Sequence, residues 1–231
     1  MSYTLNPQSF DKSAAIEIFR NNRRARISSF LSLESAIQIQ QTVMSIPVYH
    51  QACFVDGQSQ LINPTKFAEL ELSQRQEFIK KIYAQAAQGT GFWYGRYEPN
   101  GEVLESVQKI KNWLESDEML SLMREVSGYG ELTRITMQLT RYNPGDFLTR
   151  HNDLVSAENR KIAYVLNLAP KWHPDWGGLL QFYQPNGTPI ESWSPDFNSF
   201  GIFDVSLPHS VTSVAQFSPA SRYTISGWYH S

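Results

Sequence analysis

A change in composition after Gly130 restricts the fold of this chain more than any other feature of its sequence. Beyond that point Thr, Ile, Val, Tyr, Phe and Trp occur in short alternating runs, separated by turn-forming pairs such as Pro-Gly, Gly-Gly and Asn-Gly. Alternating β-branched and aromatic residues are typical of antiparallel strands with one buried face. We therefore predict strands at residues 131–141, 147–153, 161–168, 178–183, 188–193, 199–204, 209–215 and 221–229.

The first 130 residues differ, because their apolar side chains recur mainly at helical spacing. No internal repeat or low-complexity tract divides the chain. The expected fold is one α+β domain over residues 1–231, in which residues 1–130 form a helix-rich support for a β core at 131–231. We predict helices at residues 11–24, 32–45, 64–72, 73–88, 103–114 and 117–126, a strand at 48–54 that turns at Asp56-Gly57, and another strand from Phe92.

Composition limits the partners and the compartment that we expect. A hydrophobic fraction of 41% supplies a substantial core, and a net charge of −2 creates no field that would attract nucleic acid or an anionic membrane. Cys53 is the only cysteine, which fits a reducing compartment, and we find neither a signal-peptide pattern nor an apolar run that could span a bilayer. We therefore expect a cytoplasmic protein without membrane or nucleic-acid partners, and the sequence predicts no oligomeric state.

The cluster of Arg20, Arg23, Arg24 and Arg26 is expected to form a solvated face, with contact to an acidic or nucleic-acid partner as the alternative.

The candidate site begins with residues 142–153, which end in His151-Asn152-Asp153. In an extended strand this spacing places the side chains of His151 and Asp153 on one face. A His-x-Asp pair alone is common, but His209 stands at the start of a later predicted strand and offers a third ligand. Two imidazoles and one carboxylate occupy one face of an octahedron and leave three positions open, which suits non-haem Fe(II).

The order His-x-Asp, then His, then Arg resembles that of the Fe(II)/2-oxoglutarate-dependent dioxygenases, and within them the prolyl 4-hydroxylase-like branch. The resemblance extends over residues 133–229. It implies a double-stranded β-helix, or jelly roll, with the N-terminal helices packed on one side. It also implies Fe(II) as the metal, 2-oxoglutarate as the cosubstrate and ascorbate as the reductant. The residues that carry it are His151, Asp153, His209, Arg222, Trp176-Gly177-Gly178 and Ser226-Gly227-Trp228.

Arg222 would bind the cosubstrate in such a site. 2-Oxoglutarate occupies two metal positions through its C1 carboxylate and keto oxygen, which leaves its C5 carboxylate in need of a fixed cation. A guanidinium can bind that carboxylate through two parallel hydrogen bonds, whereas lysine offers a point charge. Thr224 and Ser226 share the face of Arg222 along the predicted strand, so their hydroxyls would line the same pocket.

The resemblance also assigns roles to three further residues. In the resembling hydroxylases a tyrosine upstream of the His-x-Asp pair donates a hydrogen bond to 2-oxoglutarate, and Tyr142 has the matching position. The position of a second tyrosine corresponds to Asn167 in this chain, and the asparagine amide can still donate. Trp228 matches a tryptophan that lines the substrate pocket. Residues 154–160 are too charged for a buried strand, and we expect them to form a mobile loop over the metal.

These residues together predict an oxidoreductase, a dioxygenase that couples decarboxylation of 2-oxoglutarate to succinate and CO2 with hydroxylation of a substrate carbon. The resemblance makes a prolyl residue of a protein the expected target. Because the same barrel also serves other substrates, an oxygenase that acts on a small molecule or a nucleic acid is an alternative. The alternatives from other classes are a zinc hydrolase, which would not require Arg222, and a non-oxidative cupin-like metal-binding protein.

Overall fold

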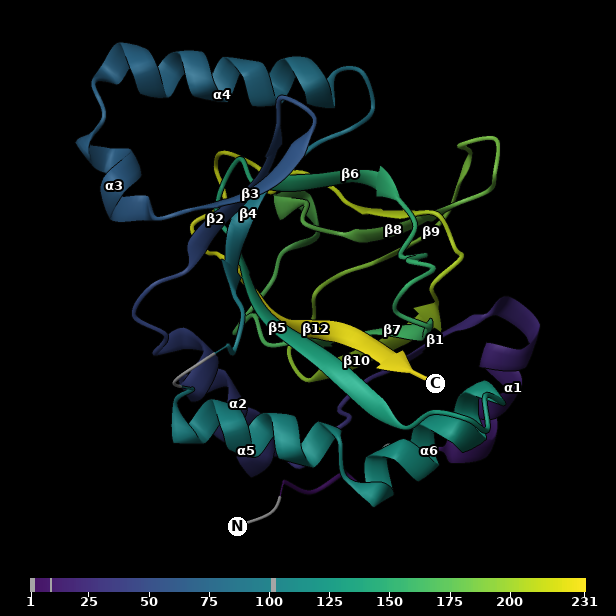
Figure 1. The fold of residues 1–231 in the computed structure, drawn as a ribbon. Coiled ribbons are helices and arrows are strands. Elements are labelled where there is room, and N and C mark those ends of the chain that lie inside the picture. Colours follow the sequence, from purple (N-terminus) through teal and green to yellow (C-terminus); the bar gives the residue numbers. More distant parts are fainter. Residues whose placement is uncertain (1–2, 9, 101–102) are drawn as a thin grey trace.

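The computed structural model describes residues 3–8, 10–100 and 103–231 of the chain. Within these residues twelve strands form one antiparallel sheet that curls into a half-barrel, with helices on two sides of it (Figure 1). The helices are α1 (Lys12–Asn22), α2 (Leu33–Met44), α3 (Pro64–Glu69), α4 (Leu72–Ala86), α5 (Glu105–Leu114), α6 (Asp117–Ser127) and the 3₁₀ helix η1 (Pro174–Trp176). The strands are β1 (Arg24–Ile27), β2 (His50–Val55), β3 (Gln58–Ile62), β4 (Phe92–Tyr97), β5 (Arg134–Tyr142), β6 (Phe147–His151), β7 (Arg160–Asn167), β8 (Leu180–Tyr183), β9 (Pro189–Trp193), β10 (Ser199–Asp204), β11 (His209–Val211) and β12 (Arg222–His230).

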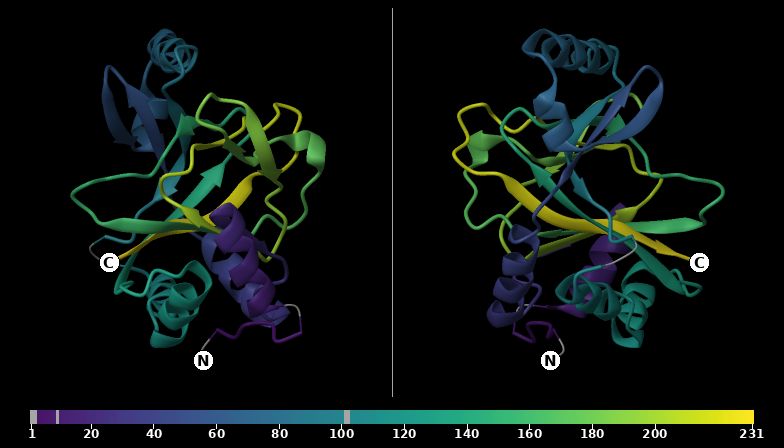
Figure 2. Two further views of the ribbon diagram at one scale, coloured as in Figure 1. Left: turned by 90° about the vertical axis from the view of Figure 1, so that its right-hand side faces the viewer. Right: turned by 60° about the vertical axis from the view of Figure 1, so that its left-hand side comes forward.

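The sheet has two halves that β4 joins. One half has the strand order β1-β10-β7-β12-β5, and the other has the order β6-β11-β8-β9. β4 pairs with β5 through Gly95 to Tyr97 and with β6 through Phe92 and Trp93. Figure 2 shows from the side how the sheet curls so that the two halves face each other. This arrangement confirms the predicted α+β jelly roll, and each strand predicted beyond residue 130 is present as one of β5 to β12.

Four helices cover the outer face of the larger half. α1, α2, α5 and α6 lie together on this side (Figure 1), and their apolar residues form one core with those of the sheet. In α2 the side chain of Ser32 caps the N-terminus, and Ala36, Ile39 and Val43 recur on the buried face. No helix within the described residues is both long and apolar enough to cross a bilayer.

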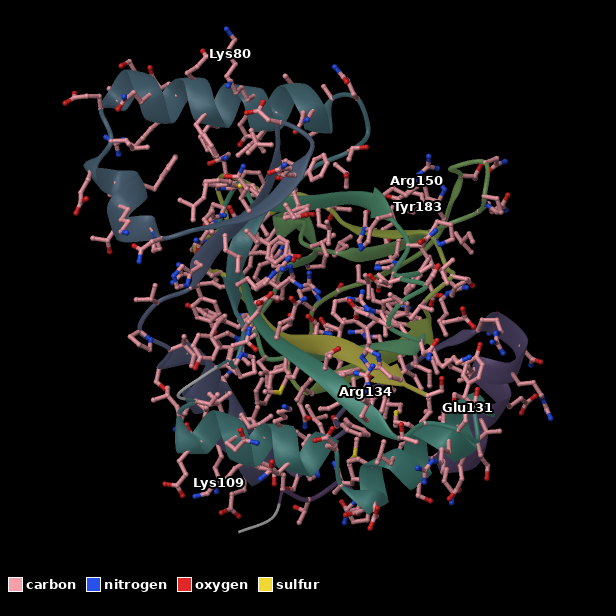
Figure 3. The ribbon with its side chains drawn as sticks, in the orientation of Figure 1. Lys80, Lys109, Glu131, Arg134, Arg150 and Tyr183 are labelled. Atoms are coloured by element: carbon pink, nitrogen blue, oxygen red, sulfur yellow. The ribbon has the colours of Figure 1, made fainter. Side chains whose placement is uncertain are left out.

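The remaining two helices, α3 and α4, lie at the opposite end of the molecule (Figure 2). α4 packs on the hairpin of β2 and β3, where Ile82 joins a small core with Cys53 and Val55. The sequence analysis predicted β2 and its turn but not β3, whose residues are mostly exposed. This hairpin offers a second apolar surface, which is why α3 and α4 do not pack with the other four helices. Lys80 on α4 and Lys109 on α5 point away from the sheet at opposite ends (Figure 3).

The arginine cluster lies partly on a strand that the sequence analysis did not predict. β1 pairs with β10 in register from Arg24 to Ile27. Arg23, Arg24 and Arg26 form ion pairs with carboxylates distant in the sequence, those of Asp204, Glu191 and Asp196. The expectation of a solvated face is wrong for Arg24, whose side chain is only 11% exposed. Three of the four arginines thus pair with carboxylates of β9, β10 and the segment between these strands.

Gly227 lies where no side chain fits. A Cβ at this position would lie 1.9 Å from the carbonyl oxygen of Thr136 and 2.9 Å from the hydroxyl of Tyr164. Side chains alternate along a strand, so Ser226 and Trp228, which flank Gly227, lie on the same face of β12. Both line the interior cavity described below.

Candidate active site

The interior of the half-barrel holds a cavity of about 340 Å³. Its walls come from both halves of the sheet and from β4, so residues from widely separated segments meet there. All predicted site residues except Asn167 line this cavity: Tyr142, His151, Asp153, His209, Arg222, Ser226 and Trp228.

His151, Asp153 and His209 form the only group of potential metal ligands that the described residues contain, with ligand atoms within 4.8 Å of one another. β6 and β11 pair so that His151 lies directly opposite His209. The Nε2 atoms of His151 and His209 lie 3.6 Å and 3.5 Å from the two carboxylate oxygens of Asp153. Three donor atoms therefore converge on one point, as expected for a metal, although their role as ligands stays a prediction.

Hydrogen bonds to the backbone orient both imidazoles. His151 Nδ1 donates to Thr149 O at 2.9 Å, and His209 Nδ1 donates to Leu207 O at 2.9 Å. A proton held on Nδ1 leaves the lone pair of Nε2 free for a metal, and such outer partners also fix the ring orientation. Both rings are thus in the tautomer that a metal requires.

The charges of the three residues are suited to a cation. Burial by itself raises the pKa of Asp153, but the hydrogen bond from His151 and the charges of both histidines lower it to about 2. Burial lowers the pKa of His209 to about 4, so this imidazole is neutral at pH 7. Burial also acts to lower the pKa of His151, but hydrogen bonding to Asp153 and its charge outweigh this effect and raise the pKa. His151 is therefore the ligand at which a proton competes most strongly with a metal.

This difference predicts how metal affinity depends on pH. An imidazole must be deprotonated to bind a metal, so the proton on His151 opposes metal binding at pH values below the raised pKa of this residue. His209 is already deprotonated above its own lowered pKa, so it contributes little to the pH dependence of metal binding there. We expect Mn(II) affinity to fall about ten-fold per pH unit on the acid side of the His151 titration, with one proton released per ion. Calorimetric titrations in buffers of different ionisation enthalpy measure both quantities. An Mn(II) affinity that stays constant between about pH 8 and about pH 6 would contradict this prediction.

Arg222 lines the same cavity. It is 2% exposed, and neither its Nε nor its Nη1 has a hydrogen-bond partner within the described residues. Burial lowers the pKa of Arg222 to about 10, so the guanidinium is still charged at pH 7. A buried charge without a partner is costly, and an anion bound in the cavity would provide the missing acceptors. Arg222 therefore fits a carboxylate ligand.

The wall beside Arg222 is polar. The hydroxyls of Thr140 and Thr224 are hydrogen bonded to each other, and Gln138 Nε2 donates to Ser226 Oγ at 3.2 Å. Tyr142 lies directly opposite Arg222 in the register of β5 and β12, and Arg222 Cζ lies 5.2 Å from the centre of its ring. Thr224 and Ser226 line the cavity, as the alternation along the strand predicted.

Asn167 is the predicted site residue that the cavity does not include. Its side chain is buried, and its Nδ2 donates to Ser199 Oγ on the neighbouring strand β10 at 3.1 Å. Asn167 lies directly opposite Thr224 in the register of β7 and β12. Its Oδ1 lacks a partner within the described residues, so its assignment to the cosubstrate stays a prediction.

Trp228 also lines the cavity, and its side chain lies near the carboxylate of Asp153. Arg160 Cζ lies 3.6 Å from the centre of its ring, and Arg160 also pairs with Glu158. The predicted loop 154–160 ends at this point, where His230 Nδ1 and Arg134 Nη2 donate to Glu158 O. The start of the loop is more open, since Leu154 is 59% exposed. Whether the loop moves stays a prediction.

The sequence analysis missed the contribution of β4 to the cavity. Phe92, Tyr94 and Arg96 alternate along this strand and all line the cavity. Period-two alternation was the signal that could have found them, but it does not indicate which face of a strand points inward. Tyr94 stacks on Tyr142 with ring centres 4.7 Å apart.

A jelly-roll half-barrel with two histidines, one aspartate and a buried arginine in one cavity is the arrangement expected of a non-haem metal protein built on this fold. Comparison with known proteins narrows this class. Residues 137–230 match the family described as the 2OG-Fe(II) oxygenase superfamily. The chain is 34% identical over 116 residues to the prolyl 3-hydroxylase OGFOD1 of Mus musculus, a match that covers 47% of this chain and 21% of the mouse protein.

Two solved structures share the fold over most of the chain. A prolyl-4-hydroxylase of Pseudomonas putida has a TM-score of 0.61 at 17% identity, covering 95% of this chain and 98% of the other. A prolyl hydroxylase of Trichoplax adhaerens, solved with a peptide fragment of hypoxia inducible factor, has a TM-score of 0.64 at 18% identity, covering 95% of this chain and 88% of the other. Residues 137–230 are thus similar to the 2OG-Fe(II) oxygenase superfamily, and the chain shares its fold with the two prolyl hydroxylases. It matches only 20% to 26% of the length of its curated relatives.

Proposed function

We propose that this protein is an Fe(II)/2-oxoglutarate-dependent dioxygenase that hydroxylates a prolyl residue of a protein substrate. The observation that carries the proposal is the presence, in one cavity, of a convergent His-Asp-His set and a buried arginine without a partner. The donor set fits Fe(II), because two neutral nitrogens and one carboxylate leave open positions. The unpaired guanidinium fits the distal carboxylate of 2-oxoglutarate.

His151, Asp153 and His209 would hold the iron, and Arg222 would hold the cosubstrate. When bound, Fe(II) and 2-oxoglutarate supply an oxidant that inserts one oxygen atom of O2 into a carbon–hydrogen bond, while the cosubstrate leaves as succinate and CO2. The residues of the chain bind and orient both molecules. Burial of Arg222 strengthens its attraction to a carboxylate, because little water screens the charges there. Tyr142, which faces Arg222, would add a hydroxyl donor to the same ligand.

A prolyl substrate is supported by the relatives and by an aromatic side chain that lines the cavity. The mouse relative is named a prolyl 3-hydroxylase, and a relative from Ostreococcus tauri is named a prolyl 3,4-dihydroxylase. Trp228 offers a flat apolar wall against which a pyrrolidine ring can pack. Ascorbate as the reductant and a cytoplasmic location belong to the same proposal, and they rest on the resemblance and on the single buried Cys53.

The cosubstrate reaction offers a first test. Purified protein given Fe(II), 2-oxoglutarate and ascorbate in air should form succinate slowly even without its substrate, because this half-reaction needs only residues already in the cavity. Full activity with Zn(II) in place of Fe(II) would favour a hydrolase instead. Inertness with both metals, together with ligand binding, would favour a non-catalytic cupin-like protein.

The substrate requires a separate experiment. Proteins from cells with and without this gene are compared by mass spectrometry, and peptides that carry one additional oxygen are assigned to a residue. We expect the difference to fall on proline in a small number of proteins. Succinate formation without any oxygen-dependent change in the proteome would contradict a protein substrate and favour a small molecule.

A further inference from the structure

Four side chains from three strands form a continuous stack along the inner wall of the cavity. Arg222 Cζ lies 5.2 Å from the ring centre of Tyr142, the rings of Tyr142 and Tyr94 are 4.7 Å apart at an angle of 11°, and Arg96 Cζ lies 5.3 Å from the ring centre of Tyr94. The strand register produces this order, because Tyr142 faces Arg222 on β12 and Arg96 on β4 faces Thr140. Tyr94 and Arg96 therefore extend the wall that begins with Arg222.

The hydrogen bonds of Tyr94 leave one proton unused. Arg96 Nη2 donates to the Tyr94 hydroxyl oxygen at 2.6 Å, so this oxygen is already an acceptor. A phenol has one proton to donate, and no residue that the structure describes accepts it. Tyr94 is nevertheless only 4% exposed and lines the cavity. A buried hydroxyl proton without an acceptor is unfavourable, and an oxygen of a bound ligand would satisfy it.

Arg96 is fixed in the position that this arrangement requires. Its Nη1 donates to Glu98 Oε1 at 3.1 Å while its Nη2 donates to Tyr94, so the guanidinium bridges the two residues. Burial raises the pKa of Tyr94, although the Arg96 charge acts in the opposite direction. The phenol therefore keeps its proton across the neutral range, and the charge of Arg96 makes it a stronger donor.

We propose that Tyr94 is a further cosubstrate-binding residue, which donates its hydroxyl proton to an oxygen of 2-oxoglutarate, and that Arg96 is the residue that positions it. This inference rests on the proposed function, because it takes a 2-oxo acid as the ligand of the cavity. Asn167, the asparagine assigned to the cosubstrate from the sequence, does not line the cavity, whereas Tyr94 does. The proposed hydrogen bond to the cosubstrate thus comes from β4 rather than from β7.

The test measures ligand binding rather than turnover. Protein loaded with Mn(II) under anaerobic conditions is titrated with 2-oxoglutarate by calorimetry, for the wild type and for Tyr94→Phe. Phenylalanine keeps the stack on Tyr142 but removes the donor, so we expect an affinity about ten-fold lower with unchanged Mn(II) content. Tyr97→Phe is the matched control, since Tyr97 lies on the same strand but packs against the outer core, and it should bind like the wild type.

Arg96→Met tests the positioning role. If Arg96 acts through the Tyr94 hydroxyl, the substitution should weaken 2-oxoglutarate binding in the wild-type background and have no further effect when combined with Tyr94→Phe. An equal effect in both backgrounds would overturn the positioning role. Equal titration curves for the wild type and Tyr94→Phe would overturn the inference about Tyr94 alone. Failure of the Mn(II)-loaded wild type to bind 2-oxoglutarate would overturn the proposed function and this inference with it.

Discussion

Replacing His209 with alanine is expected to abolish both iron retention and succinate formation. His209 supplies one of three convergent donor atoms, and its ring is held by Leu207 O with Nε2 toward Asp153. Changing only an outer partner of a metal ligand typically costs about 10- to 100-fold in metal affinity, so loss of the ligand itself should cost more than about 100-fold. Metal content after dialysis, measured by mass spectrometry of the element, and succinate formation are both followed. Alanine at His151 or Asp153 should have the same effect.

A histidine outside the cavity provides the control. His173 is exposed and lies beside η1, so His173→Ala should keep normal iron content and normal succinate formation. If His209→Ala retained full iron content and turned over normally, the assignment of the metal site would be wrong.

The Arg222 substitutions separate cosubstrate binding from metal binding. Arg222→Lys keeps the positive charge but loses the two-pronged geometry of the guanidinium, so iron should stay bound while the affinity for 2-oxoglutarate falls. Loss of one charge-assisted hydrogen bond costs about 1.5–3 kcal/mol, which is roughly ten- to a hundred-fold in affinity. Arg222→Gln should cost more, because the carboxylate of the ligand would then be buried without a counter-charge.

Pyruvate and a second arginine make this prediction specific. Pyruvate lacks the distal carboxylate, so its binding should change little in either Arg222 variant. Arg141, next to Tyr142 on β5, stacks on Tyr49 on the outer side of the sheet, and Arg141→Lys should leave 2-oxoglutarate binding unchanged. Identical 2-oxoglutarate titrations for the wild type and both Arg222 variants would contradict the role of Arg222 and weaken the oxygenase proposal.

Features that depend on one segment of the chain could be predicted from the sequence more readily than features that depend on contacts between distant segments. The strands beyond residue 130 and the six longer helices were predicted because each depends on a periodicity within one segment, which reflects backbone geometry. The pair His151 and Asp153 was predicted to share a face for the same reason. The convergence of His209 and Arg222 on this pair followed from the resemblance, and the structure brings all four into one cavity.

Features that depend on cross-strand pairing were not predictable in this way. β1 is four residues long, and its arginines resemble a solvated surface until Glu191 and Asp196 are placed beside them. The mostly exposed strand β3 has no buried face to give it a pattern. α3 and α4 were predicted as helices, but their place depends on the hairpin that β3 completes.

The sequence by itself thus determined the order of the elements, the β character of the core and the residue types of the candidate metal site. The tertiary structure decided which side chains meet in the cavity. It brings Tyr94 and Arg96 beside Tyr142 through the pairing of β4 with β5, and it places the amide of Asn167 in a hydrogen bond with Ser199. The reason is physical: periodicity fixes the two faces of a strand, but only the register between strands and the packing of the half-barrel decide which face and which neighbours line the site.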